Sequence, residues 1–448
     1  MSQALTTATP AKERRTAAWV AFIACTALVF DGYDLTIYGT VMPTLMNDPS
    51  HIGPLDGATA GALGSYAMLG VLAGALITGG IGDYLGRRRM ILLSITWFSV
   101  GMILTSFATS VLAFGLLRFL TGLGLGAVLA TAGATMAEFA PADKKNLYNA
   151  IVYAGIPAGG VLAALLGMIL LDPIGWRGLF LIGALPILLI PVAWFKLPES
   201  PRWLLSRGRR EEAIRVAERT GIALVDESQT ADDKAVERTG FAALMTPRYL
   251  LPTILIGFMS FSGLLLTYGL NTWLPRIMEG YGYGTTYSLA FLLFLNGGAV
   301  IGCLLGSKVA DRVGPKRVVT GTFILAALSL SLMTIELPFA TLLLLISIAG
   351  VGTLGTQVLI YGFVATYYTT NTRAAGVAWC AGFGRLGGVA GPAVGGLITT
   401  LGLTGGAAFY VFGGVALFGA GITQLVRRQK DLEEIDVVQR EQRQTQDA

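Results

Sequence analysis

The sequence is poor in charge, histidine and cysteine. Only 13% of its 448 residues are charged, and the one histidine is His51. A single histidine excludes most histidine-based metal sites and catalytic triads. The three cysteines, Cys25, Cys303 and Cys380, lie in apolar runs without metal-ligand spacing, which indicates core residues without a disulfide role. The sequence has no nucleotide-binding loop and no nucleophile elbow, so neither enzymatic activity nor a bound cofactor is expected.

Apolar residues instead dominate the chain. Hydrophobic residues make up 54% of it and 59 residues are glycine, a composition too apolar for a soluble domain but suited to close helix packing in a membrane. An apolar run of roughly 20 residues crosses a bilayer as a helix. We therefore predict an all-α integral membrane protein with 12 transmembrane helices. The expected spans are 17–46, 57–84, 89–108, 110–140, 146–171, 176–197, 248–278, 285–310, 317–336, 338–368, 374–401 and 405–426.

The basic residues predict the orientation in the membrane. Of 32 lysines and arginines, Arg118 and Arg385 lie within spans, and Arg177 and Arg276 lie near the side opposite the termini. The other 28 lie on the side of the two termini, which the positive-inside rule identifies as the cytoplasm. The net charge of +5 therefore reflects membrane topology, and no nucleic-acid partner is expected.

The chain divides into two similar halves. Gly82–Arg89 recurs as Ala310–Arg317, and Gly122 and Gly124 recur as Gly350 and Gly352. Two parallel six-span repeats resemble the major facilitator fold, which holds its substrate at mid-membrane between pseudo-symmetric halves. The predicted units are a cytoplasmic N-terminal segment (1–16), a six-helix bundle (17–197), a cytoplasmic linker (198–247), a second six-helix bundle (248–426) and a cytoplasmic tail (427–448).

Two carboxylates interrupt the first apolar run. Asp31 and Asp34 are three residues apart, so they share one helix face, which Tyr38 continues. An acid at the bilayer centre costs roughly 2.5–3.5 kcal/mol, and such acids usually bind protons or ligands. The alternative is a pair of structural hydrogen bonds between helices.

Two arginines also lie inside spans. Arg118 is expected at nearly the depth of the two aspartates, where it pairs with a carboxylate, either one that substrate can switch or one in a permanent structural salt bridge. Arg385 is flanked by glycines and needs an anion partner. A substrate carboxylate and an internal acid both fit that need. Neither half repeats the buried charges of the other.

The repeated loop resembles the signature loop of the major facilitator superfamily. In that superfamily an acid and several arginines tie helix ends together on the cytoplasmic side. Glu138, at the inner end of the fourth span, is expected to pair with this cluster as a latch; the alternative is a substrate contact. The predicted gating residues are Asp83, Arg87, Arg88, Glu138, Asp311 and Arg317.

The segment Asp31-Gly32-Tyr33-Asp34, together with Asp83 and Arg385, resembles the aromatic acid:proton symporter family, which includes bacterial benzoate and 4-hydroxybenzoate permeases. The resemblance implies a secondary active transporter of the bacterial cytoplasmic (inner) membrane. It would take up a monocyclic aromatic carboxylate with protons by alternating access, with the first-span aspartates and Arg385 required for transport. A monomer is the expectation for the fold.

Further side chains in the spans are candidates for substrate binding. Aromatic rings suit stacking on a benzene ring, and amides can read a ring hydroxyl, although the same residues are ordinary in membrane cores. None of them distinguishes benzoate from its hydroxylated analogues. With Arg385, the candidates are Arg118, Tyr38, Asn271, Gln357, Tyr361 and Phe383.

Two motifs keep other transport functions open. Gly391-Pro392-Ala393-Val394-Gly395-Gly396 resembles a motif of drug/proton antiporters and supports an exporter of drugs or organic acids. Pro198-Glu199-Ser200-Pro201-Arg202 occurs in sugar porters and organic-ion carriers, but the glutamine pair of sugar porters is absent from the fifth span. A membrane sensor that binds without turnover is a further alternative, although no signalling domain is evident.

Overall fold

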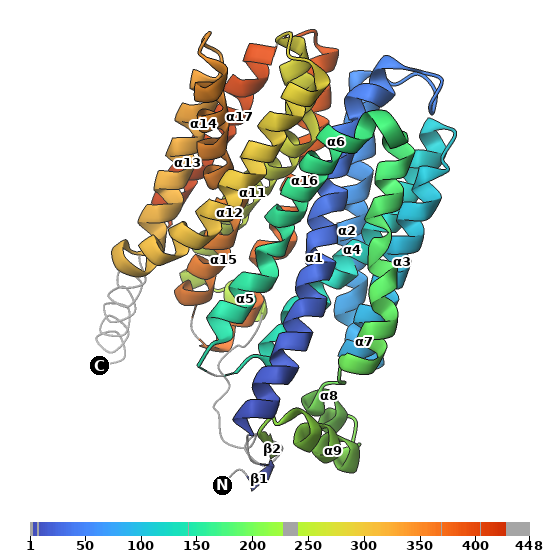
Figure 1. The fold of residues 1–448 in the computed structure, drawn as a ribbon. Coiled ribbons are helices and arrows are strands. Elements are labelled where there is room, and N and C mark those ends of the chain that lie inside the picture. Colours follow the sequence, from blue (N-terminus) through green and yellow to red (C-terminus); the bar gives the residue numbers. More distant parts are fainter. Residues whose placement is uncertain are drawn as a thin grey trace, which may run out of the picture.

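Long membrane-crossing helices form nearly the whole molecule. The computed structural model describes residues 3–6, 9–141, 143–226, 241–368, 370–403 and 405–426. Two helical bundles lie side by side, one blue to green and one yellow to red (Figure 1). We call the end where the first helix begins the inner end and the opposite end the outer end.

The first bundle contains six crossings. Its fifth crossing is interrupted between two helices, and the chain kinks again near Pro173, where Gly175 adopts a positive φ of 66°. Its helices are α1 (Pro10–Asn47), α2 (Gly57–Leu85), α3 (Arg87–Ser106), α4 (Val111–Phe139), α5 (Lys145–Tyr153), α6 (Gly155–Gly183), η1 (Leu185–Leu189) and α7 (Ile190–Lys196).

The second bundle also contains six crossings. A π-helical segment interrupts its fourth crossing, between α14 and α15. Its helices are α11 (Pro247–Gly280), α12 (Thr285–Val313), α13 (Pro315–Leu332), α14 (Phe339–Gly350), η3 (Val351–Gly355), α15 (Thr356–Tyr367), α16 (Thr370–Thr400) and α17 (Gly405–Leu425).

The number of crossings agrees with the prediction. Within the described residues, nine helical stretches are long and apolar enough to cross a membrane. One of them, 147–196, is 50 residues long and bends back at Gly175, so it crosses twice. The helices α13 and α16 complete the set, packed against α17 and α11. The predicted all-α fold with 12 spans in two halves is confirmed.

The sequence repeat is visible in the backbone. Gly86 and Gly314 end α2 and α12 with φ values of 89° and 91°, a conformation open to glycine but rare for other residues. Gly122 packs on the α2 backbone and Gly350 on the α12 backbone. A side chain at either position would push the paired helices apart, so the repeated glycines set the same helix spacing in both halves.

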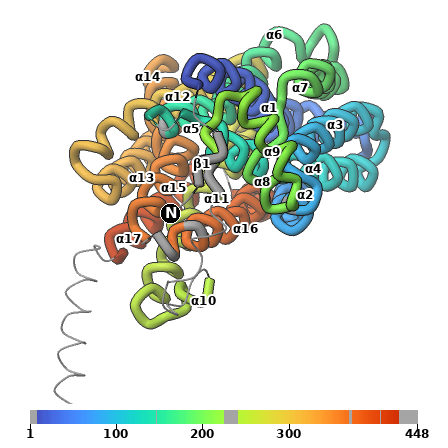
Figure 2. The backbone as a smooth tube through the Cα atoms, turned by 90° about the horizontal axis from the view of Figure 1, so that it is seen from below, coloured from blue at the N-terminus to red at the C-terminus, as the bar shows by residue number. Residues whose placement is uncertain are grey.

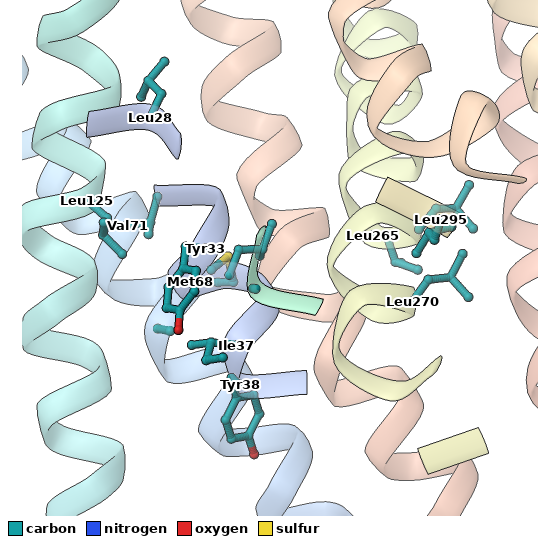
Figure 3. Close-up of a cluster of buried hydrophobic side chains, with 14 of the residues drawn as sticks. Leu28, Tyr33, Ile37, Tyr38, Met68, Val71, Leu125, Leu265, Leu270 and Leu295 are labelled. Carbon is teal, nitrogen blue, oxygen red and sulfur yellow. The ribbon is translucent and has the colours of Figure 1, made fainter. Parts of the chain in front are cut away.

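Apolar side chains fill the interior of each bundle. Figure 3 shows Tyr33 and Ile37 of α1 near Met68 of α2, and a separate group with Leu265 and Leu295 in the second half. Large apolar side chains are also exposed around the outside, for example on α2, α3 and α12, where a bilayer covers them.

A small unit lies at the inner end, below the first bundle (Figures 1 and 2). It contains β1 (Gln3–Thr6), α8 (Pro201–Ser206), α9 (Arg210–Thr220) and β2 (Leu224–Asp226); α10 (Phe241–Leu244) precedes the second bundle.

In this unit β1 pairs antiparallel with β2, and Thr16 donates from α1 to the Thr220 carbonyl over 3.2 Å. The expected polar segment 1–16 thus contains a strand and the start of α1, because helix formation needs no apolar run where α1 emerges from the bilayer. Residues 227–240 of the linker and the predicted tail 427–448 lie outside the described residues.

Candidate functional site

A buried ion pair joins α1 to α4 in the middle of the first half. Arg118 donates to Asp34, and each residue is 1% exposed. The Tyr38 ring lies 5.5 Å from the guanidinium carbon, while its hydroxyl donates to the Ala60 carbonyl over 2.6 Å. The predicted pairing of Arg118 with a carboxylate is thus present, and Tyr38 packs against it. The second Asp34 oxygen, Oδ2, has no partner among the described residues.

Asp31 lies one turn before Asp34 but in different surroundings. Its side chain is half-buried, and among the described residues it has no hydrogen bond or ion pair. It interacts electrostatically with Asp34 and, across the interface between the halves, with Arg385. An accessible, unpaired carboxylate in the middle of a span can accept and release a proton.

Arg385 occupies the middle of α16 in the second half. It lies between Gly384, which packs on the Ser260 hydroxyl, and Gly388, whose added Cβ would lie 3.1 Å from the Tyr268 ring. The arginine is half-buried, and no acid lies within ion-pair distance of it in the described part of the chain. Its guanidinium is therefore available to an external anion.

Three tyrosines lie near this arginine, and a glutamine pairs with one of them, Tyr361. Tyr153 at the end of α5, Tyr268 on α11 and Tyr361 on α15 all lie within electrostatic reach of Arg385. All three are half-buried. Gln357, one turn before Tyr361, donates its amide to the Ser260 hydroxyl over 2.8 Å. Tyr153 was not among the predicted candidates, because a tyrosine in an apolar span is common and carries no distinguishing signal.

Asn271 belongs to a polar network that crosses between the halves. Its Oδ1 accepts hydrogen bonds from Thr36 of α1, over 3.3 Å, and from Asn296 of α12, over 2.8 Å. Its amide nitrogen donates to the Thr267 carbonyl over 2.8 Å, and the side chain is buried. Asn271 is thus engaged in joining α1, α11 and α12 in this conformation.

Phe383 faces away from Arg385. Two residues along a helix are about 200° apart, and Phe383 packs instead with Trp379 and Phe258, at ring distances of 5.3 and 5.2 Å. Phe258 in turn contacts Phe418 on the exposed face of α17. The structure therefore places this predicted candidate in an aromatic cluster outside the charged centre.

The halves meet closely at their outer ends. Gly57 and Gly61 of α2 lie against the backbone of α16 at Gly396 and Pro392. Ser65 donates to the Val389 carbonyl over 2.8 Å. Because α1 also meets α11, and α6 meets α12, the outer half of the interface is closed over the charged centre.

The predicted gating cluster lies at the inner end of the first bundle. Arg87 pairs with Glu138 over 3.4 Å, and Ser200 donates to the other oxygen of Glu138. Glu199 accepts from the Arg88 backbone N–H over 3.1 Å, so the linker binds the loop between α2 and α3.

Two further members of that predicted cluster are not joined to it, and the side chain of a third is not described. The Asp83 side chain lies outside the described residues. Asp311 and Arg317, in the second copy of the loop, are exposed and form no ion pair with any described residue. Among the described residues, the latch contacts in this conformation therefore connect the first bundle with the linker.

An apolar groove of about 480 Å³ lies apart from the charged centre, between α2 and α16. Its walls include Tyr66, Leu69, Leu386 and Leu397, and they contain no charged residue. This groove lacks the groups needed to bind an organic anion.

Comparison with known proteins agrees with the predicted resemblance. The family model described as Major Facilitator Superfamily matches residues 24–335 and 285–445. The chain is 33% identical to the benzoate transport protein of Acinetobacter baylyi, covering 84% of this chain and 82% of that protein. It is 34% identical to the gentisate transporter of Corynebacterium glutamicum, covering 90% and 86%.

A third relative is the 4-hydroxybenzoate transporter of Acinetobacter baylyi, which is 31% identical over 85% of this chain and 84% of that protein. Among solved structures, the inward open xylose transporter from E. coli superposes with a TM-score of 0.72 at 17% identity, covering 94% of this chain and 99% of that one. At this identity the likeness concerns the fold.

Proposed function

The chain belongs to the major facilitator superfamily, and from this premise we propose that it takes up a monocyclic aromatic carboxylate together with protons. Membership makes it a multi-pass membrane transporter and not an enzyme. The predicted resemblance to aromatic acid transporters is confirmed by its relatives. The substrate, the coupling ion and the roles of individual residues form our proposal.

One observation carries the proposal. Asp31 and Arg385 are opposite charges in the middle of spans from different halves, each half-buried and neither in an ion pair with a described residue. Unpaired charges at this depth cost free energy, and residues that carry them usually have a function. In this proposal Asp31 carries the proton and Arg385 binds the substrate carboxylate, for which its planar fork is well suited.

The two sites cooperate through their charges. A proton on Asp31 neutralises the acid, which leaves Arg385 free to attract an anion. When the substrate carboxylate occupies Arg385, the proton on Asp31 avoids repulsion between two neighbouring carboxylates. Asp34 stays with Arg118, and this pair holds α1 against α4 while the neighbouring acid titrates.

Proton coupling also meets the electrical cost of uptake. A membrane potential that is negative inside opposes entry of an anion by about 2.3 kcal/mol per charge per 100 mV. One accompanying proton cancels this term, and a second reverses its sign. The proposed location is the bacterial inner membrane, with both termini in the cytoplasm, as a monomer. The closed outer ends would then correspond to a conformation that releases substrate inward.

The alternatives have weaker support. The Gly-Pro segment of α16 that favoured an exporter packs against α2 at the outer interface, which accounts for it as a packing element. Sugar porters share the fold, but a sugar needs no counter-charge such as Arg385. Transport of another organic anion is the remaining alternative. Competition by aromatic acids for uptake distinguishes it from our proposal.

The first test is uptake of labelled benzoate into proteoliposomes with and without an acid-outside pH gradient. We expect the gradient to stimulate accumulation, 4-hydroxybenzoate and gentisate to compete, and glucose to have no effect. Uptake that ignores both the gradient and the aromatic acids would contradict the proposal.

Replacing Asp31 tests the proton site directly. We expect Asp31→Asn to lower gradient-driven accumulation at least about tenfold, while exchange of internal for external substrate persists because neutral Asn mimics the protonated acid. Asp172→Asn, in an exposed position of the first half, is the matched control and should accumulate normally. Intact gradient-driven accumulation by Asp31→Asn would exclude Asp31 as the coupling group.

A further inference from the structure

Two tyrosine hydroxyls from different halves lie beside the guanidinium proposed to bind the substrate. Tyr153 comes from the first half and Tyr361 from the second, and each lies near Arg385 and near the other. Both side chains are half-buried, so each keeps part of its surface exposed.

Tyr153 is held in place by the break in the fifth span. It is the last residue of α5, and its hydroxyl lies against Gly133 of α4, where an added Cβ would overlap it. No hydrogen bond to this hydroxyl is found among the described residues. The glycine thus leaves room for a polar group that has no hydrogen-bond partner in the described part of the chain.

Tyr361 is placed by contacts around Arg385. It follows Gln357 by one turn of α15, and Gln357 is fixed by its hydrogen bond to Ser260. Ser260 in turn packs on Gly384, the residue before Arg385. This chain of contacts holds Tyr361 in the second half at the side of the arginine.

We propose that Tyr153 and Tyr361 form a subsite for a ring hydroxyl, so that the transporter favours hydroxylated benzoates over benzoate itself. The inference rests on the proposed function, because it requires an aromatic carboxylate bound at Arg385. A phenol both donates and accepts a hydrogen bond, so two phenols can satisfy one substrate hydroxyl. A site that hydrogen-bonds a hydroxyl discriminates against the analogue that lacks it.

The charges nearby favour a neutral ring substituent. Asp31 lies in the same region, and once it releases its proton a second carboxylate on the ring would lie beside a negative charge. A hydroxyl has no such repulsion. The proposed preference therefore covers monohydroxybenzoates and excludes aromatic dicarboxylates.

The test compares transport of benzoate, 3-hydroxybenzoate and 4-hydroxybenzoate by the full chain in proteoliposomes. In the wild type we expect KM to be at least about fivefold lower for one hydroxybenzoate than for benzoate, the size of one neutral hydrogen bond. Tyr153→Phe and Tyr361→Phe should each reduce this preference about fivefold, by raising the KM of the hydroxybenzoate more than that of benzoate.

Tyr410→Phe serves as the matched control. Tyr410 is 59% exposed on α17 and its hydroxyl pairs with Thr334 at 3.0 Å, and it has no interaction with Arg385 among the described residues. An unchanged preference in Tyr153→Phe and Tyr361→Phe would overturn the inference, as would an equal loss for all three acids, which indicates a structural role. Either result leaves benzoate uptake by the wild type intact, whereas failure of the proposed function means that the wild type takes up none of the aromatic acids.

Discussion

Asp31 and Asp34 are three residues apart on α1, yet they meet different surroundings. Asp34 is enclosed with Arg118, whereas Asp31 is half-buried and has no ion-pair partner among the described residues. Removing one member of a buried ion pair leaves an uncompensated charge, and this commonly costs about 3–5 kcal/mol. Replacing a half-buried, unpaired acid leaves no buried counter-ion without its partner. The two aspartates should therefore be separable by stability alone.

The predicted outcome is a clear difference between two conservative substitutions. We expect Asp34→Asn to lower the free energy of unfolding by about 3 kcal/mol or more, because Arg118 is left buried without its counter-ion. Asp31→Asn should change it by less than about 1 kcal/mol. Denaturation of the purified transporter in detergent measures both values.

A double variant provides the control for this comparison. Asp34→Asn combined with Arg118→Met removes both charges, so it should recover much of the stability lost in the single variant. Equal destabilisation by Asp31→Asn and Asp34→Asn would contradict the division between a structural and a titrating acid.

At the scale of single residues, the sequence predicts a site where a charged side chain interrupts an apolar run. Charges inside apolar runs identified Asp31, Asp34, Arg118 and Arg385, and their depths along the spans predicted the Arg118 pair. Tyr153 could not be found this way, because its role depends on which side of a helix faces Arg385 rather than on its residue type.

At the scale of elements, the contact between α2 and α16 decides whether the outer end is closed. Gly57 and Gly61 allow the α16 backbone to approach within a distance that no side chain permits. Small residues of this kind replace hydrophobic burial as the basis of helix association in membranes. Bulk at this contact should therefore oppose closure.

We predict that Gly61→Leu keeps the outer end open and lowers transport at least about tenfold. A cysteine at position 65, in a background without the three native cysteines, should then react faster with a membrane-impermeant maleimide added from outside. Gly79→Leu is the matched control on the same helix, since a Cβ there meets no atom within 4 Å. Equal labelling of the two variants would exclude this contact as the closing element.

The sequence did not predict the strands that pair with distant segments of the chain. The strand Gln3–Thr6 pairs with Leu224–Asp226, more than 200 residues away, and neither segment alternates long enough to predict a strand. The helix pattern was predictable because each span must satisfy its own backbone hydrogen bonds. The β1–β2 pair forms only where two distant segments meet, so the local sequence of either segment does not predict it.

At the scale of the whole molecule, the linker is bound to the first bundle. Glu138 forms an ion pair with Arg87 and accepts a hydrogen bond from Ser200. Glu199 accepts a hydrogen bond from the backbone at the start of α3. The second copy of the loop lacks these contacts within the described residues. The first half and residues 198–226 of the linker are therefore joined, whereas α10 at the end of the linker packs on α11 and α16 of the second half.

Loosening this connection should be measurable as local opening. Glu138→Gln weakens charge-assisted contacts worth about 1–2 kcal/mol, so we expect proteolysis within 201–226 to quicken about five- to tenfold. Glu212→Gln is the control, because its ion pair with Arg209 on α9 is exposed and contributes little. Equal cleavage rates would show that Glu138 does not hold the linker.

The unequal charges of the two halves also have a consequence for biosynthesis. Asp31 is inserted with the first helix, whereas Arg385 emerges from the ribosome about 350 residues later. At about 5–20 residues per second, that interval lasts roughly 20–70 s. Throughout it, the nascent first half contains an acid whose counter-charge has not been synthesised, so this acid must stay protonated or turn toward the headgroups until the second half joins it.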